Sequence, residues 1–455
     1  MKLTWHSSAC VAFESSNTKV LFDPWLSQPA FLGSWQQWPP PESALDVVLS
    51  TKFDYIVYTH FHSDHWDAKF LKEYLDRWAK DSYRPIILIA SNSWHQLSKS
   101  ISDIARDRAD IVLLKSGKKY SLNSNDFEIT SWVSDYCDPL ACGKLLPCFE
   151  PESNFRAIDS VSLIKDKDFS VLNLNDAVVS NIDTHLEAAG IKADLVMGVF
   201  GAAGSFPQCM SNLSNEVKEF EKDRFMQNAL SRLVLASERL KAKYIFPFAG
   251  QYILSGRLSN LNEFRAIVPV SEASTNLRKM TDKEILTLST NESIIFEKGK
   301  VSEMGTEYSE PSNETKLEYL EAKNLKYPYE MRSLEKVDAR ELLKNLEHAS
   351  QKLANVYSSM KKIDYTILIQ ASNSDLVWNL HFADELRVSQ NKTTSDEYSK
   401  VTLDLRLLDG CVRRKSNFQG FTSMHWNQAH IGSHLTFNQT SYNSTAHYLL
   451  NFLHT

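Results

Sequence analysis

Four side chains that bind metal ions lie within six residues of one another. His60, His62, Asp64 and His65 form the pattern H-x-H-x-D-H directly after the apolar run 55–58. Side chains two residues apart on an extended segment point the same way, so His60 and His62 can bind one ion together. The turn that follows brings Asp64 and His65 towards a second position. Imidazole and carboxylate donors suit zinc or non-haem iron. The motif therefore predicts a divalent metal site, zinc first, with iron or manganese as alternatives.

Strands and helices alternate around this motif. Amphipathic patterns predict helices near 66–80, 94–106 and 214–242, which indicates an α/β layered domain with the motif in a strand-to-helix loop. Residues 25–41 are rich in aromatic residues and proline and predict a packed loop without a regular element. The apolar runs that predict strands are 3–5, 10–13, 20–22, 55–58, 85–90, 111–114, 127–132, 160–164, 169–174, 195–200 and 244–248.

Length and charge narrow the class of protein. The 455 residues allow two or three domains, and 43% hydrophobic with 23% charged residues is typical of a globular protein. Lys and Arg total 50 against 56 Asp and Glu, so no basic field attracts nucleic acid, and we expect none as a partner. No apolar run reaches the roughly eighteen residues of a membrane span, and the start MKLTWHSSAC lacks a signal-peptide core. A cytoplasmic protein is the expectation.

A change of composition near 300–315 suggests a domain boundary. We therefore expect one domain over residues 1–305 and a second, of unknown role, over 315–455. Strands are predicted at 365–370, 376–382 and 401–407, and a final helix at 444–453. His430 and His434 have the spacing of one helical face, yet the apolar residues of 426–437 alternate as in a strand, so metal binding is not favoured there.

The metal motif resembles that of the metallo-β-lactamase superfamily, which carries H-x-H-x-D-H at the end of a strand. Asp23-Pro24 after the strand 20–22 resembles the first hairpin of that superfamily. The segments DPWLSQPAFLGSWQQWPPP, YTHFHSDHWD, GAAGSFPQCM and YIFPFAGQY resemble, in this order, the metallo-β-lactamase-like portion of the cytidine monophosphate N-acetylneuraminate hydroxylases, over roughly residues 1–265. The resemblance implies an αββα sandwich, here followed by a C-terminal α+β domain.

The resemblance also implies a ligand set. His60, His62, Asp64 and His65 match the superfamily motif, and Asp176 stands where the bridging carboxylate is expected. The stretch that normally supplies a third-motif histidine has none. A thiolate is a legitimate zinc or iron ligand, so we predict Cys137 in that role. The alternatives are Asp135, Asp138 and the spare His185, and Gly256 and Arg257 stand where the last metal histidine would follow.

Three functions remain open at this point. The first is a metal-dependent hydrolase in which the ion lowers the pKa of a water, Asp64 acts as the catalytic residue, and the small-molecule substrate is a sugar nucleotide or another ester or phosphodiester. Trp25, Gly204 and Ser205 are the predicted substrate-binding residues. The second is a non-haem iron oxygenase that needs a separate reductase partner, since the chain contains no C-x-H…C-x-x-H pair. The third is a degenerate, non-catalytic binding protein.

Overall fold

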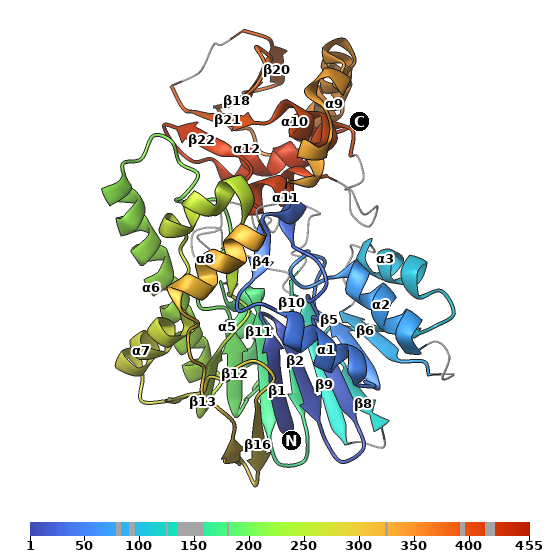
Figure 1. Cartoon of the computed structure of the whole chain (residues 1–455). Coiled ribbons are helices and arrows are strands. Elements are labelled where there is room, and N and C mark those ends of the chain that lie inside the picture. Colours follow the sequence, from blue (N-terminus) through green and yellow to red (C-terminus); the bar gives the residue numbers. More distant parts are fainter. Residues whose placement is uncertain are drawn as a thin grey trace.

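A computed structural model gives the structure of most of the chain. It describes residues 1–78, 83–90, 96–123, 126–133, 159–179, 182–323, 326–391, 396–414 and 424–455. Two large sheets stand in the lower half of the molecule and a smaller sheet lies above them (Figure 1). No helix of the described residues has the length and apolar character needed to cross a membrane.

The first large sheet begins as an antiparallel meander and continues with parallel strands. Strands β1, β2 and β3 follow one another along the chain and pair antiparallel. Strands β5, β6 and β7 then continue the sheet from β3 and run parallel to it. In spatial order the strands are β17 (Lys300–Met304), β16 (Ser293–Glu297), β1 (Lys2–Ser7), β2 (Cys10–Glu14), β3 (Lys19–Phe22), β5 (Tyr55–Tyr58), β6 (Ile86–Ala90) and β7 (Asp110–Leu114). The metal motif directly follows the carboxyl end of β5.

The second large sheet also combines the two strand directions. Strands β11, β12, β13 and β15 are parallel, whereas β8, β9 and β10 pair antiparallel. The strands in spatial order are β15 (Glu284–Ile285), β13 (Tyr244–Pro247), β12 (Leu195–Gly198), β11 (Ser170–Asn175), β10 (Ser160–Lys165), β9 (Phe127–Val133) and β8 (Lys119–Leu122). Because β10 runs against β11, the start of β10 and the end of β11 lie at the same edge.

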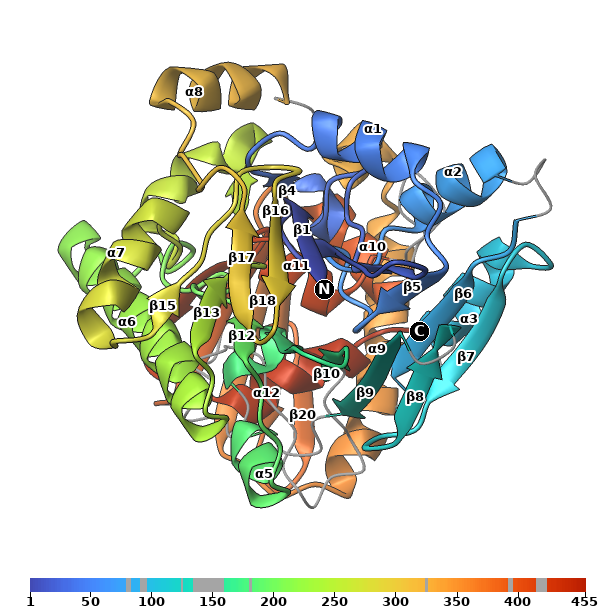
Figure 2. The ribbon, with the colours of Figure 1, turned by 90° about the horizontal axis from the view of Figure 1, so that it is seen from below.

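Helices cover the outer face of each large sheet. One apolar core fills the space between the sheets and extends under the helices of the second sheet, and another lies between the first sheet and its helices. Figure 2 shows the two groups of helices on opposite sides. They are α1 (Glu42–Ser50), α2 (Ala68–Trp78) and α3 (Gln96–Ala105) on the first sheet, and α5 (Ile182–Ala188), α6 (Asn215–Arg239) and α7 (Val270–Met280) on the second. The predicted αββα sandwich is confirmed.

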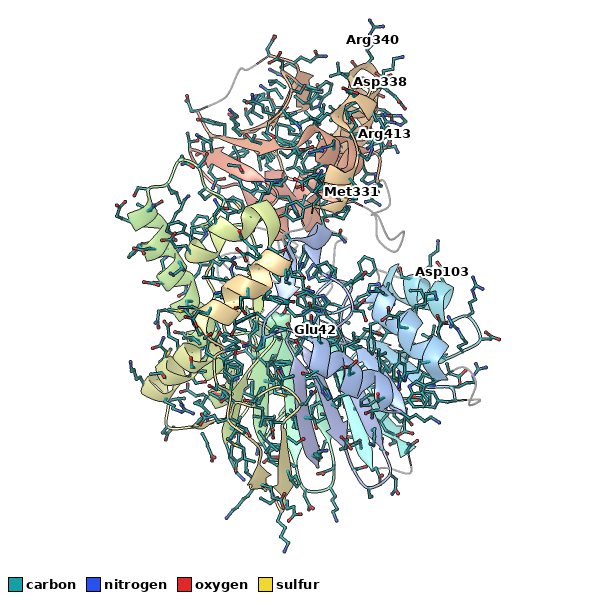
Figure 3. The ribbon with its side chains drawn as sticks, viewed as in Figure 1. Glu42, Asp103, Met331, Asp338, Arg340 and Arg413 are labelled. Carbon is teal, nitrogen blue, oxygen red and sulfur yellow. The ribbon has the colours of Figure 1, made fainter. Side chains whose placement is uncertain are left out.

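The C-terminal unit, residues 327–455, sits on the upper edge of the sandwich (Figure 1). Helix α8 (Asn313–Ala322) precedes it. Its sheet consists of β20 (Leu386–Ser389), β19 (Val377–Phe382), β18 (Tyr365–Ala371), β21 (Tyr398–Leu403) and β22 (Thr436–Gln439). Its helices are α9 (Ala339–Ser358), α10 (Leu405–Val412), α11 (Trp426–Ile431) and α12 (Ser444–Leu449). Figure 3 places Met331, Asp338 and Arg413 along one side of this unit.

The C-terminal unit shares an apolar core with loops of the sandwich. Phe31 and Trp35 from the aromatic loop, and Tyr252 from beyond β13, pack in one cluster with residues of the C-terminal unit such as Trp426 and Leu435. The division into domains 1–305 and 315–455 remains a prediction, because this core joins side chains from both.

Three local predictions were wrong. Residues 25–41 contain a regular element, β4 (Trp35–Gln37), which pairs with β14 (Tyr252–Leu254), a partner too distant in sequence to be visible in a local pattern. The strand predicted at 401–407 ends at Leu403. Asp404 then caps α10, since its carboxylate accepts a hydrogen bond from the Arg406 N–H. The alternating pattern at 426–437 is helix α11 followed by β22.

The C-terminal unit should lose stability in mild acid because it buries neutral histidines. Burial lowers the pKa of His430 to about 4, and burial above all lowers those of His425, His434 and His447 to about 3. In the unfolded chain a histidine binds a proton below about pH 6.5, whereas the folded chain excludes it. The unfolded state therefore binds more protons, so this stability is complete above about pH 6.5 and falls as the pH drops towards the folded pKa.

One histidine should account for about 2 kcal/mol of unfolding free energy between pH 7 and pH 5. The free energy of unfolding of the unsubstituted protein should fall between pH 7 and pH 5. In His447→Phe this fall should be about 2 kcal/mol smaller, as measured by urea unfolding at each pH. His348→Phe, at an exposed position on α9, is the control. An equal loss in His447→Phe and the unsubstituted protein would show that His447 does not exclude its proton.

Candidate metal centre

The predicted metal residues meet at one edge of the sandwich. His60 and the rest of its motif follow β5 in the first sheet, and Asp176 follows β11 in the second. Because the two sheets stack, the loops at the ends of these strands face each other. The sequence motif and the residue from the other sheet therefore converge on one place.

One group of ligand atoms joins His60, His62 and Asp159. The Nε2 atom of His60 lies 3.0 Å from Nδ1 of His62 and 3.8 Å from Oδ1 of Asp159. The three ligand atoms lie within 4.8 Å of one another. Two histidines and one carboxylate at this spacing could hold a shared metal ion.

A second group joins His60, His65 and Asp176. One carboxylate oxygen of Asp176 lies 3.4 Å from Nε2 of His65, and the other lies 3.8 Å from Nε2 of His60. The two oxygens of Asp176 thus face different histidines, as a bridging carboxylate requires. Asp64 adds an oxygen 3.6 Å from Nε2 of His65, and its Oδ1 is buried without a hydrogen-bond partner among the described residues.

The charges at the site suit a bound cation. Burial raises the pKa of Asp64 to about 7, with a further rise from the charge of Asp176 and an opposing effect of His65. Burial by itself would lower the pKa of His65, but the charges of Asp64 and Asp176 outweigh it and hold that pKa well above the ordinary value. Carboxylates concentrated in a buried place require positive charge, and a divalent ion supplies it. The residues present fit such an ion.

Asp23, which directly follows β3, holds residues of the metal motif in place through hydrogen bonds. Its side chain is fully buried and accepts hydrogen bonds from the Thr59 N–H at 2.8 Å, the Thr59 hydroxyl at 2.7 Å and the Asn175 amide at 2.7 Å. It also lies 3.2 Å from Nδ1 of His65. A carboxylate on Nδ1 fixes the tautomer of His65 and leaves Nε2 available to a metal.

The structure brings most of the predicted ligands together. His60, His62, Asp64, His65 and Asp176 meet as described above. Cys137, Asp135 and Asp138 lie outside the described residues. His185 is exposed on α5 and belongs to neither ligand group of the described part of the chain.

The predicted substrate-binding residues also have defined places. Trp25 is buried in the shared core, and its indole donates a hydrogen bond of 2.6 Å to the carbonyl of Gln28. Gly204 has the left-handed φ of 127° that favours glycine, with open space where a side chain would project. Ser205 is fully buried. None of these contacts places a substrate.

Asp159 was missed by the sequence reasoning. It immediately precedes β10, the strand antiparallel to β11, so it lies at the same edge as Asp176. The signal in the sequence was a carboxylate directly before β10, a strand that is antiparallel to β11. The pairing of β10 with β11 was needed to use it.

Phe31 of the aromatic loop contacts both the metal motif and the C-terminal unit. The Phe31 N–H donates to the hydroxyl of Ser63 at 2.9 Å, and its ring centre lies 6.0 Å from that of His62. The Phe31 carbonyl lies 2.9 Å from Nε2 of His434, which must donate. At the position where the superfamily's last histidine would follow, Arg257 pairs with Glu330 of the C-terminal unit at 2.8 Å. The C-terminal unit thus holds the loop that lies beside the metal motif.

Comparison with known proteins agrees with this geometry. Residues 2–140 match a family model described as "Beta-lactamase superfamily domain". Over these residues the chain is similar to the domains of this superfamily. Members of this superfamily typically bind divalent metals, and the described His and Asp residues form a group that can hold one.

The chain is also similar to curated proteins named as cytidine monophosphate-N-acetylneuraminic acid hydroxylases. The cytidine monophosphate-N-acetylneuraminic acid hydroxylase of Cricetulus griseus is 25% identical over 267 residues, which cover 56% of this chain and 41% of the relative. The Homo sapiens protein, described as inactive, is 24% identical over 262 residues, 56% of this chain and 46% of the relative. The chain thus spans less than half the length of these relatives.

Two solved structures are similar at lower identity. One is a mutant of the CmlA β-hydroxylase, with a TM-score of 0.41 and 16% identity, covering 65% of this chain and 54% of that one. The other is an isothiocyanate hydrolase from Delia radicum gut bacteria, with a TM-score of 0.42 and 12% identity, covering 65% of this chain and 99% of that one.

The contribution of Asp159 to metal affinity can be measured. Asp159→Asn should weaken metal affinity by about tenfold or more, because a carboxylate beside His60 and His62 is replaced by a neutral amide. Competition with a chromophoric chelator measures the affinity. Asp168→Asn, in the turn between β10 and β11, is the control. Unchanged affinity in Asp159→Asn together with a loss in Cys137→Ser would assign this ligand to Cys137 instead.

Proposed function

We propose that this chain is a metal-dependent hydrolase that cleaves an ester or phosphodiester bond in a small molecule, with a sugar nucleotide as the first class to test. The observation that carries the proposal is the position of Asp176, whose two carboxylate oxygens face His60 and His65. Together with Asp64 and Asp159, it surrounds a place for one or two divalent ions.

The protein residues would have separate tasks in such a reaction. A bound divalent ion lowers the pKa of a water and polarises the electrophilic oxygen of the substrate. Asp64 presents a buried oxygen, Oδ1, that makes no hydrogen bond within the described residues, so it can orient the attacking water and accept its proton. Asp23 holds the ring of His65 in place through Nδ1.

An iron-dependent hydroxylase is the second candidate. Each ligand group contains two histidines and one carboxylate, which is also the donor set of non-haem iron oxygenases. The curated relatives are named as hydroxylases. This function would require a reductase partner that supplies electrons.

Metal identity and turnover separate the candidates. Protein purified without added metal should contain zinc or manganese, at about one to two equivalents, and should hydrolyse bis(p-nitrophenyl) phosphate or a p-nitrophenyl ester. Bound iron with oxygen consumption and no hydrolysis would favour the hydroxylase. Absence of tightly bound metal and of both activities would contradict both and leave a binding protein.

A further inference from the structure

Arg265 is a buried cation that no carboxylate neutralises within the described part of the chain. The residue is 5% exposed. Its guanidinium donates a hydrogen bond from Nη1 to the carbonyl oxygen of Tyr252 and also interacts with the hydroxyl of that tyrosine. Its Nε is buried without a hydrogen-bond partner among the described residues. Arginine is almost never this buried unless it is paired. The position therefore requires an explanation.

Three other arginines of the region are paired with carboxylates. Each donates to a carboxylate at short distance and is compensated by it. The pairs are Arg257 with Glu330 at 2.8 Å, Arg332 with Asp409 at 2.8 Å and Arg406 with Asp404 at 2.7 Å. Arg265 differs from all three, and the cost of burying its charge is not offset by any acid that the structure describes.

Aromatic rings connect Arg265 to the metal motif. From His62 the series runs to Phe31 at 6.0 Å and to Trp35 at 4.5 Å, and Trp35 stacks on Tyr252 with 3.3 Å between ring centres. The guanidinium carbon of Arg265 lies 4.7 Å from the centre of the Tyr252 ring. A continuous series of ring contacts, called here the aromatic wall, thus connects Arg265 with the predicted metal ligand His62.

Electrostatic interactions agree with this placement. Burial raises the pKa of Tyr252 to about 12, although the charge of Arg265 and its hydrogen bond oppose the rise. The charge of Asp64 in the metal motif makes a smaller contribution to the rise. Burial lowers the pKa of Lys316 on α8, the charge of Arg265 lowers it further, and the carboxylate of Glu310 opposes this change. The charge of Arg265 therefore reaches Lys316, whose own acid neighbour is Glu310, and Tyr252 links Arg265 to the metal motif through Asp64.

The polar atoms along this wall can all donate hydrogen bonds. The Trp35 indole N–H and Nε of Arg265 are buried without hydrogen-bond partners among the described residues. The Tyr252 hydroxyl interacts with the Arg265 guanidinium and can still donate its own proton. Two neutral donors beside a guanidinium match the oxygens of an anion, and a buried charge gains most from such a partner. A cationic group would be repelled by the guanidinium, and a neutral acceptor would gain less than an anion from its charge.

We infer that Arg265, Tyr252 and Trp35 form an anion-binding subsite for a phosphate or carboxylate group of the substrate, beside the metal centre. The inference rests on the proposed function, since it describes the substrate of the same site. The subsite requires a substrate whose anionic group stands apart from the bond that is cleaved. Its role is binding, and the reacting atoms lie with the metal ligands.

Binding of simple anions tests the subsite without reference to turnover. Phenyl phosphate, benzoate and neutral benzyl alcohol are titrated into the full-length protein as purified, and tryptophan fluorescence is followed because Trp35 belongs to the subsite. At least one anion should bind more tightly than the alcohol. Tighter binding of phenyl phosphate assigns a phosphate, and tighter binding of benzoate assigns a carboxylate.

Arg265→Met distinguishes a binding role from a structural one. It should weaken anion binding by about tenfold to a hundredfold, because a charged hydrogen bond is lost. Its thermal midpoint should be unchanged or higher, since an apolar side chain of similar size replaces an unpaired buried charge. Arg406→Met, which removes a paired arginine, should instead lower the midpoint and leave anion binding intact.

Two results would overturn the inference. One is equal anion affinity in Arg265→Met and the unsubstituted protein, which would place the anion on the metal alone. The other is no preference for either anion over benzyl alcohol. Because binding is read without hydrolysis, a chain that binds anions through Arg265 but hydrolyses nothing would contradict the proposed function and not the subsite.

Discussion

His60→Ala is expected to abolish tight metal binding and, with it, hydrolysis. His60 is the one residue common to both ligand groups, with Nε2 within 3.8 Å of a carboxylate oxygen in each. Its loss should therefore exceed the roughly 10–100-fold fall in metal affinity that follows loss of an outer-shell partner. Metal content after dialysis and affinity by chelator competition measure the effect.

His185→Ala provides the matched control. His185 is exposed on α5 and lies in neither ligand group, so this variant should retain metal and activity. Circular dichroism should show that both variants fold. If His60→Ala kept its metal, the position of the site derived from the geometry would be wrong.

Asp23→Ala is expected to damage both the fold and the site although Asp23 belongs to neither ligand group. The substitution removes the acceptor of three hydrogen bonds and leaves the donors of Thr59 and Asn175 buried. Each unsatisfied donor costs about 1–3 kcal/mol. His65 also loses the partner of its Nδ1, so metal affinity should fall by roughly 10–100-fold.

Asp194→Ala separates the two effects of Asp23→Ala. Asp194 directly precedes the amino end of β12. Its carboxylate accepts hydrogen bonds from the Ser170 N–H at 3.0 Å and the Ser170 hydroxyl at 2.7 Å. Its loss should lower the free energy of unfolding while leaving metal affinity unchanged. Equal metal affinity in Asp23→Ala and the unsubstituted protein would mean that Asp23 supports only the fold.

The sequence predicts best what is local. His60, His62, Asp64 and His65 lie within one loop, so their spacing alone predicts a shared ion. The strand before them is a short apolar run whose burial follows from its composition. Asp176 required the resemblance to a family, because nothing in its own neighbourhood links it to a loop more than a hundred residues earlier.

Residues that depend on long-range pairing could not be predicted. Asp159 reaches His60 through the pairing of β10 with β11, and Trp35 becomes part of a strand through its distant partner β14. The contact between His434 and Phe31 joins residues 403 positions apart. Arg265 carries no motif at all. Only the structure shows that this arginine is buried without a carboxylate partner among the described residues.

The position of the bound metal tests the central claim most directly. Anomalous scattering at the absorption edge of the metal, measured on crystals of the metal-loaded full-length protein, locates the ion without assumptions about activity. We expect a peak among His60, His62, Asp159 and Asp176, with a second ion, if present, between Asp176 and His65. A protein that binds metal but shows its peak elsewhere, for example among the histidines of the C-terminal unit, would contradict it.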